Sequence, residues 1–317
     1  MSRYRHQLPQ LSDDVFLTDS GLETTLIFHD GLDLPQFAAF WLLADSAGRQ
    51  RLDRYFREHA AVAAEAGVGF ILEAATWRAS PDWGALLGYS ADELAQANRD
   101  AIAMLVDLRQ QIDDGARPLV VSGAIGPRGD GYDGSALMSA EEAADYHAVQ
   151  IETFAGTEAD MVNAMTMTYP GEAIGIVRAA RDAGMPCAIS FTVETDGTLP
   201  DGTALGEAIR QVEDATDGSA AYFAINCAHP SHFAAVLDPA ADWAQRLRGI
   251  RANASRQSHD EHDNADVLDD GDPDELAEDY ARLRATLPAL TVLGGCCGTD
   301  LRHVRAIAAS LKRDVMA

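Results

Sequence analysis

Two kinds of hydrophobic pattern alternate along the chain. In the first, apolar residues form short continuous runs, which are typical of strands buried on both faces of a parallel sheet. In the second, apolar residues recur at steps of three and four, which is typical of helices with one buried face. The runs that predict strands are residues 15–17, 69–76, 118–125, 160–168, 186–193, 222–226, 247–254 and 290–293. The segments that predict helices are residues 51–66, 91–113, 139–156, 171–183, 204–216, 274–286 and 300–312.

This alternation predicts the fold class. Strands that alternate with helices form parallel sheets covered by helices, and eight such units are typical of a (β/α)8 barrel of the TIM type. We therefore expect residues 1–317 to form a single barrel domain. Ser139 and Glu142 have the spacing of a capping box and mark the start of one of its helices. Because active sites of these barrels lie at the carboxyl ends of the strands, residues directly after each strand are the first candidates for function.

The charge of the chain narrows the choice of partners. Its formal net charge is −26, and Lys312 is its one lysine. A field of this sign repels nucleic acid and anionic membranes, so we expect neither as a partner. The acidity fits an ordinary acidic enzyme, and the alternative is an adaptation to high salt, where screening weakens repulsion between carboxylates.

Composition indicates the compartment. Apolar residues make up 47% of the chain, enough for a large core. No apolar run approaches the roughly 18 residues that a membrane helix requires. Four cysteines without a secretory leader predict a reducing, cytoplasmic location.

One acidic segment interrupts the regular pattern. Nine of the sixteen residues 260–275 are acidic, and Gly271 and Pro273 exclude a continuous helix. Such a block is typical of a solvated, mobile loop, which we place at about residues 256–273.

The cysteines carry the clearest chemistry. Cys227 and the adjacent pair Cys296-Cys297 each follow a predicted strand, whereas Cys187 lies inside one and is expected in the core. Taken singly, they fit buried thiols, and the pair also fits a vicinal disulfide. Taken together at the ends of parallel strands, they predict a three-sulfur zinc site with one open position, the layout of a catalytic zinc. We expect the glycines around the pair to permit a tight turn with positive φ.

These residues carry a family resemblance. Asn226-Cys227, followed by the segment 294–298 (Gly-Gly-Cys-Cys-Gly), resembles the zinc signature of the homocysteine S-methyltransferase family. Residues 17–24 resemble the family's opening strand with its Asp-Gly-Gly motif, and Gly126-Pro127 matches its third strand end. The resemblance implies a zinc-dependent barrel that transfers a methyl group to a thiol, with homocysteine as the acceptor and methionine as the product.

The resemblance also implies substrate-binding residues. Asp19 would hold the substrate amino group, although a turn or capping carboxylate would look the same in the sequence. Glu23 would lie beside it or cap the first turn of a short helix. His229 would form a polar pocket wall rather than act as a general base. The other expected pocket residues are Thr76, Gly126, Asn226 and Asn253.

One position departs from the family pattern. Family members end the fourth strand with Glu-Thr, whose carboxylate meets the substrate ammonium, and an ungapped alignment places Met165-Thr166 there. A buried ammonium without a partner costs on the order of several kcal/mol. Either Glu73 or Glu194 replaces the missing carboxylate, or the acceptor is a different thiol.

The sequence leaves several functions open. The resemblance suggests S-methylmethionine, S-adenosylmethionine or a betaine-like compound as the small-molecule methyl donor. A zinc hydrolase is a weaker alternative, because three thiolates make zinc a poor generator of hydroxide. A binding or sensor protein that holds a thiol without methylating it is a further alternative, and the oligomeric state stays open.

Overall fold

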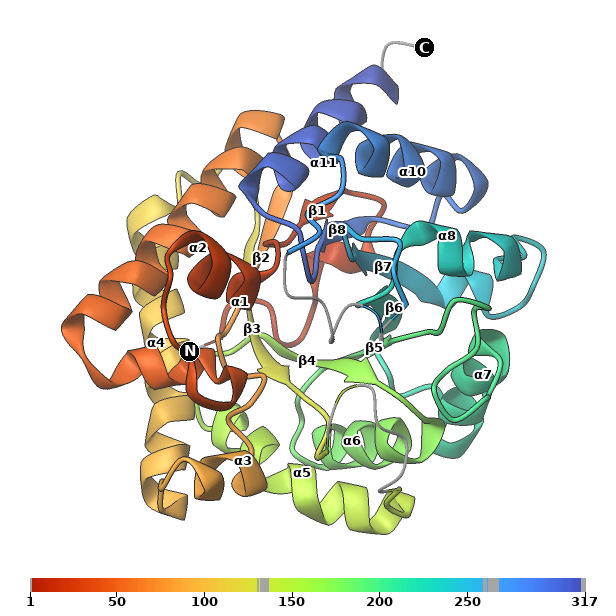
Figure 1. Cartoon of the computed structure of the whole chain (residues 1–317). Coiled ribbons are helices and arrows are strands. Elements are labelled where there is room, and N and C mark those ends of the chain that lie inside the picture. The colour runs from red at the N-terminus through yellow and green to blue at the C-terminus, as the bar shows by residue number, and fades with distance from the viewer. Residues whose placement is uncertain (1, 130, 132–136, 259–260, 262–267, 315–317) are drawn as a thin grey trace.

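Eight parallel strands close into a barrel in chain order (Figure 1). The computed structural model describes residues 2–129, 131, 137–258, 261 and 268–314. The first and last strands pair through Phe16 with Val292 and Leu17 with Leu293, which closes the ring and confirms the predicted (β/α)8 fold. The strands are β1 (Phe16–Leu17), β2 (Gly69–Glu73), β3 (Leu119–Ile125), β4 (Met161–Met167), β5 (Cys187–Phe191), β6 (Tyr222–Asn226), β7 (Leu247–Ala252) and β8 (Val292–Gly295).

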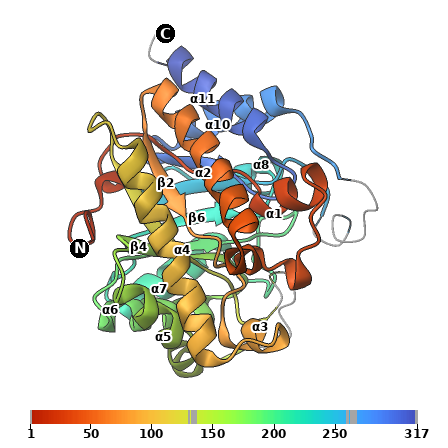
Figure 2. The same cartoon turned by 90° about the vertical axis from the view of Figure 1, so that its left-hand side faces the viewer.

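Helices surround the strands. In Figure 2 the long helices α2 and α4 lie across the outside of the barrel. These two pack on neighbouring strands, α2 on β2 and α4 on β3. In the described ranges, no helix is long and apolar enough to cross a membrane. The helices are α1 (Leu22–Thr24), α2 (Ser46–Ala66), α3 (Pro81–Leu86), α4 (Ala91–Ile112), α5 (Ala140–Ala155), α6 (Pro170–Asp182), α7 (Leu205–Thr216), α8 (Pro230–Phe233), α10 (Pro273–Thr286) and α11 (Leu301–Asp314).

The structure corrects some of the predicted boundaries. The eighth strand was predicted at 290–293 but runs from Val292 to Gly295, so the two glycines belong to the strand itself. Helix α2 begins five residues before the predicted start, because the Asp45 carboxylate accepts a hydrogen bond from the Gly48 N–H at 2.8 Å and caps it there. The short helices α3 and α8 were not predicted, whereas α1 agrees with the alternative that Glu23 lies in the first turn of a short helix. The capping box of Ser139 and Glu142 is confirmed at the start of α5.

The barrel interior has two layers of different character. The lower layer, nearer the amino ends of the strands, is an apolar cluster to which most strands contribute. Tyr222 is its largest member. Two residues further along several strands, the inward positions become polar. Because side chains alternate between the faces of a strand, Ile71, for example, is followed on the same face by Glu73. The other polar members of this upper layer are Ser122, Asn163, Ser190 and Arg251.

A buried carboxylate fastens the lower end of the barrel. One Asp160 oxygen accepts hydrogen bonds from the backbone N–H groups of Arg3 (2.7 Å) and Tyr4 (2.8 Å). The other accepts from Arg109 Nη1 (2.6 Å) and the Val121 N–H (3.0 Å). Asp160 thus ties the N-terminal segment, α4 and β3 to the start of β4. These hydrogen bonds compensate for burying the Asp160 carboxylate, so losing any of the donors would destabilise the fold.

We predict that Asp160→Ala lowers the free energy of unfolding by about 3–5 kcal/mol, since it leaves Arg109 as an uncompensated buried charge. The measurement is urea unfolding followed by circular dichroism. Asp53→Ala is the control, because Asp53 pairs with Arg57 on the exposed surface of α2, where a pair contributes about 1 kcal/mol or less. Similar losses in the two variants would contradict the structural role of Asp160.

Candidate metal centre

Three thiols meet at the carboxyl ends of β6 and β8. The sulfur atoms of Cys227, Cys296 and Cys297 all lie within 4.8 Å of one another, and Cys227 Sγ is 3.9 Å from Cys297 Sγ. None of the cysteines, all of which are described, forms a disulfide. Sulfurs bound tetrahedrally to zinc at about 2.3 Å lie about 3.8 Å apart, so the cluster is pre-arranged at nearly the spacing that a metal requires. Cys187 is buried within β5, as predicted.

Close packing, rather than a left-handed turn, explains two of the glycines beside the pair. A Cβ on Gly294 would lie 1.8 Å from Thr18 Oγ1, and one on Gly295 would lie 2.1 Å from Thr299 Oγ1. Neither glycine has positive φ. Only Gly298 does, at +77°. The expected tight turn therefore comes after the cysteines. Gly294 lets β8 pack against the end of β1, and Gly295 lets the segment after the cysteines pack back on β8.

The Asn226 side chain, at the last position of β6, positions the cysteine that follows it. Its Oδ1 accepts the Thr166 N–H (2.8 Å), and its Nδ2 donates to Thr166 Oγ1 (2.9 Å) and to Cys227 Sγ (3.3 Å). Nδ2 also faces Cys296 Sγ at 3.9 Å. Thr166 and Cys227 both have positive φ, 63° and 54°, which non-glycine residues rarely adopt. Asn226 therefore supports a strained backbone and directs an N–H group at two sulfurs.

The thiols of Cys296 and Cys297 resist ionisation when no metal is bound. Hydrogen bonding to Cys227, together with burial, raises the pKa of Cys296 to about 12. The same causes raise the pKa of Cys297 well above its ordinary value. A divalent cation in the cluster would reverse this, because a coordinated thiol loses its proton.

A buried guanidinium lies beside the cysteines. Arg251 is on β7, where the strand register pairs it with Asn226 on one side and Gly294 on the other. Its Nη2 donates to Asp19 Oδ1 at 2.5 Å, and its Nη1 lies 3.7 Å from Glu73 Oε2. The strands that carry the thiols thus enclose one positive charge between two carboxylates.

The residue that departs from the family pattern contacts this guanidinium. Met165 Sδ lies 4.0 Å from Arg251 Nη1. The Met165 carbonyl accepts a hydrogen bond from Trp77 Nε1 at 3.3 Å. A thioether therefore faces a cation within β4, two residues before its end, at the position where sequence analysis expected a carboxylate.

The remaining predicted pocket residues lie in different settings. Thr76 donates its hydroxyl proton to the Ala124 carbonyl at 2.8 Å. A Cβ on Gly126 would lie 2.4 Å from the Trp77 carbonyl oxygen, so this glycine permits a close approach. Asn253 is buried, and its Oδ1 has no hydrogen-bond partner among the described residues. Glu23 lies in the first turn of α1, and burial raises its pKa to about 7.

His229 caps a helix. Its Nδ1 accepts the Ser231 N–H at 3.1 Å at the start of α8, and burial lowers its pKa to about 4. The neutral ring therefore carries its proton on Nε2, which makes that nitrogen a donor. The role of His229 as a polar pocket wall stays a prediction.

The acidic segment is only partly described, because residues 259–260 and 262–267 lie outside the described ranges. The described residues near its end, Asp269 and Asp270, are held by hydrogen bonds to the rest of the barrel. Asp269 accepts a hydrogen bond from Ser255 Oγ at 2.6 Å, and the Asp270 carbonyl lies 2.9 Å from His303 Nε2. Its Asp269 carbonyl lies against Gly298, where a Cβ would come within 2.8 Å.

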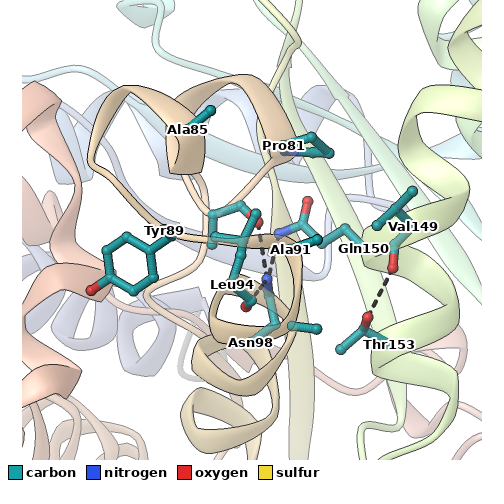
Figure 3. A pocket seen from close by; sticks show the side chains of 11 residues that line it. Pro81, Ala85, Tyr89, Ala91, Leu94, Asn98, Val149, Gln150 and Thr153 are labelled. Carbon is teal, nitrogen blue, oxygen red and sulfur yellow. Dashed lines mark hydrogen bonds between the residues drawn. The ribbon is translucent and has the colours of Figure 1, made fainter.

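A separate pocket of about 240 Å³ lies among α3, α4 and α5 (Figure 3). Its wall is mostly apolar, with the side chains of Asn98 and Gln150 as the main polar groups. None of its lining residues belongs to the cysteine site or to the predicted pocket.

Comparison with known proteins assigns the family. The profile described as Homocysteine S-methyltransferase matches residues 16–311. The chain belongs to the homocysteine S-methyltransferase family, and is thus a methyltransferase by family. A methionine synthase from Mycobacterium leprae (strain TN) is 32% identical over 143 residues, which span 44% of this chain and 11% of that relative's length.

Solved structures agree on the fold. The oxidized form of the homocysteine methyltransferase MmuM from Escherichia coli is 19% identical, with a TM-score of 0.72, and the match covers 94% of this chain and 96% of that one. The metallated form of the same protein has a TM-score of 0.68 at 19% identity, with the same coverage. At this identity the likeness shows a shared barrel.

Sequence analysis missed the role of Arg251. The available signal was a charged residue at an inward position of the strand predicted at residues 247–254. It also missed Asn163, which joins Glu73 (3.3 Å) to Ser190 (3.1 Å) in the polar layer. Both residues alternate with apolar neighbours, a period-two signal hidden within runs that were treated as continuously apolar.

We predict that Asn226→Ala weakens zinc binding about 10–100-fold, because the variant loses the amide that orients the thiols. Competition with a chromophoric chelator measures the affinity. Asn163→Ala is the control, since it removes a buried amide from the same barrel interior without touching a sulfur. Equal affinities in the two variants would show that Asn226 has no special influence on the metal.

We predict that Glu73 makes stability depend on pH. Burial raises its pKa from 4.5 to about 7, with Arg251 opposing the shift. Between these values the folded state holds a proton that the unfolded chain releases, so the free energy of unfolding falls as the pH rises, by at most about 3 kcal/mol. Urea unfolding at about pH 5 and about pH 7.5 measures this fall. It should be smaller in Glu73→Gln than in the wild type, and an unchanged fall would disprove the assignment.

Proposed function

We propose that this protein is a zinc-dependent methyltransferase that methylates a thiol, with homocysteine as the family's acceptor and methionine as the product. One observation carries the proposal: three cysteine sulfurs lie within 4.8 Å of one another at strand ends of the barrel. A cluster of three thiolates suits zinc and leaves a fourth position for a ligand.

The residues around the cluster fit a bound metal. Thiolates are soft ligands that zinc accepts readily, and Asn226 donates toward Cys227 and Cys296. When bound, zinc would hold the acceptor sulfur as a thiolate while three cysteine ligands keep its Lewis acidity low, so that the sulfur stays nucleophilic. Cys227, Cys296 and Cys297 are the residues that would hold it.

The chain's own contribution is positioning and charge. Thr166 and Asn226 fix the direction of Cys227. The unpartnered Oδ1 of Asn253 can accept a hydrogen bond from a substrate. His229 closes one wall with a neutral ring. Holding two reactants in line removes much of the entropic cost of a reaction between two molecules.

The methyl transfer balances with a cationic donor. The acceptor sulfur gives an electron pair to the methyl carbon, and a new carbon–sulfur bond forms. The bond between the methyl group and the donor's sulfonium or ammonium centre breaks, and its electron pair leaves with a neutral thioether or amine. S-Methylmethionine, S-adenosylmethionine and betaine-like compounds meet this requirement, and the acidic chain attracts such cations.

A thiol-binding or sensor protein is the second candidate, favoured by Met165 near the end of β4. Such a protein would bind zinc and a thiol without turnover. It differs from the methyltransferase only in the absence of methionine as a product, so the same preparation distinguishes the two functions.

We predict about one zinc per chain in protein purified under reducing conditions, and its loss in Cys296→Ser. Cys187→Ser is the matched control, because Cys187 is a buried core thiol away from the cluster. Elemental analysis gives the metal content. Mass spectrometry then follows transfer of a labelled methyl group from each donor class to homocysteine, before and after removal of zinc by a chelator.

The two measurements separate the outcomes. Zinc with turnover that a chelator abolishes supports the methyltransferase. Zinc without turnover for any donor favours the binding protein. Wild-type protein that takes up no zinc after anaerobic reconstitution would refute both.

A further inference from the structure

The three nitrogens of the Arg251 guanidinium differ in how well their hydrogen-bonding capacity is used. Its Nε donates to the Gly295 carbonyl at 3.1 Å, and Nη2 donates to Asp19 Oδ1 at 2.5 Å and to the Ser20 carbonyl at 3.3 Å. Its Nη1 has only long contacts among the described residues, with a Glu73 oxygen at 3.7 Å and Met165 Sδ at 4.0 Å. One nitrogen of a buried cation therefore keeps hydrogen-bonding capacity on the side of Met165.

Arg251 and Met165 are slightly less enclosed than the interior residues around them. Arg251 is 6% and Met165 9% exposed, whereas the neighbouring interior residues Asn226 and Ser190 are 0% exposed. The register places Arg251 between Asn226 and Gly294, one and two residues before the cysteines that follow β6 and β8. A small thiol that reached the three sulfurs would bring its polar end within range of this cation.

The same arrangement disfavours an ammonium group at this wall. Asp19, the expected partner of the substrate amino group, already has one oxygen bonded to Arg251. Met165 offers no carboxylate, and the guanidinium repels another cation. Asn253 can accept a hydrogen bond from an amino group, but it supplies no charge. Glu73 is the other carboxylate here, 3.7 Å from Nη1, and burial raises its pKa to about 7, so that it holds a proton more readily than an ordinary carboxyl group does. The guanidinium, by contrast, is a permanent cation whose Nη1 keeps donor capacity, and this capacity suits an anion.

We propose that Arg251 sets the acceptor specificity by binding the carboxylate of the acceptor thiol through Nη1, so that the amino group is not required. The acceptor class is then thiol carboxylates, of which homocysteine is one and its deaminated analogue is another. Arginine suits this role because its planar fork matches a carboxylate. The inference rests on the proposed function, since it takes the acceptor sulfur to lie at the cysteine cluster.

A binding measurement tests the inference without relying on turnover. The zinc site is loaded with cobalt(II), whose absorption spectrum reports thiol binding. The protein is then titrated with L-homocysteine, with 4-mercaptobutanoate, which lacks the amino group, and with 3-mercaptopropylamine, which lacks the carboxylate. We expect the first two to bind within about tenfold of each other and the amine to bind roughly tenfold or more weakly, the effect of losing a charged hydrogen bond.

Variants assign the preference to Arg251. Arg251→Gln should weaken binding of both carboxylates roughly tenfold or more, and should leave binding of the amine unchanged or tighter. Arg248→Gln is the matched control, because Arg248 lies on the same strand and its Nη1 contacts the Ser12 carbonyl on the outside. Arg251→Lys is a second variant that keeps the buried charge beside Asp19, and it should retain part of the preference if Arg251→Gln does not fold.

Each outcome decides a different point. If 3-mercaptopropylamine binds wild-type protein as tightly as 4-mercaptobutanoate does, the inference is wrong while the metal site stands. The same conclusion follows if Arg251→Gln, or Arg251→Lys in its place, leaves the preference intact. Wild-type protein that shows no cobalt spectrum would refute the metal centre itself, and the inference with it.

Discussion

The ion pair between Arg251 and Asp19 holds the candidate site together. Arg251 projects from β7, bonds the Gly295 carbonyl of β8 and reaches the carboxylate that follows β1. One guanidinium thus joins three successive strand ends around the cysteine pair. Because a parallel barrel brings all its strand ends to one rim, a single long side chain can cross-link segments that are far apart in the sequence.

Burying the Arg251–Asp19 ion pair has an energetic cost that an apolar interior would avoid. Moving charges into a protein interior costs several kcal/mol per ion unless good hydrogen bonds compensate, and apolar residues of similar volume are often no less stable. The lower layer of the barrel, built around Tyr222, shows that the fold can fill its interior with apolar groups. The polar upper layer, next to the thiols, is therefore better explained by function than by stability.

The thiols and the polar layer have complementary electrostatics. Three clustered sulfurs favour their protonated forms, and their proximity raises the pKa of Cys296 to about 12. A divalent cation would convert them to thiolates, and the Asn226 amide and the nearby guanidinium would then face negative charge. The strained backbone of Thr166 and Cys227 belongs to the same construction, since strain of this kind persists only where surrounding contacts support it.

The sequence alone determined the fold class, the placement of the three cysteines at strand ends and the core position of Cys187. These features follow from local periodicity and from the rule that parallel strands point the same way. The tertiary structure decided that the Asn226 side chain hydrogen-bonds to Thr166 and points its N–H at the sulfurs. It also decided that Asp19 pairs with Arg251, and that the Met165 thioether faces the same guanidinium. Such partners lie on different strands, and their choice depends on barrel register and side-chain direction, which no local pattern encodes.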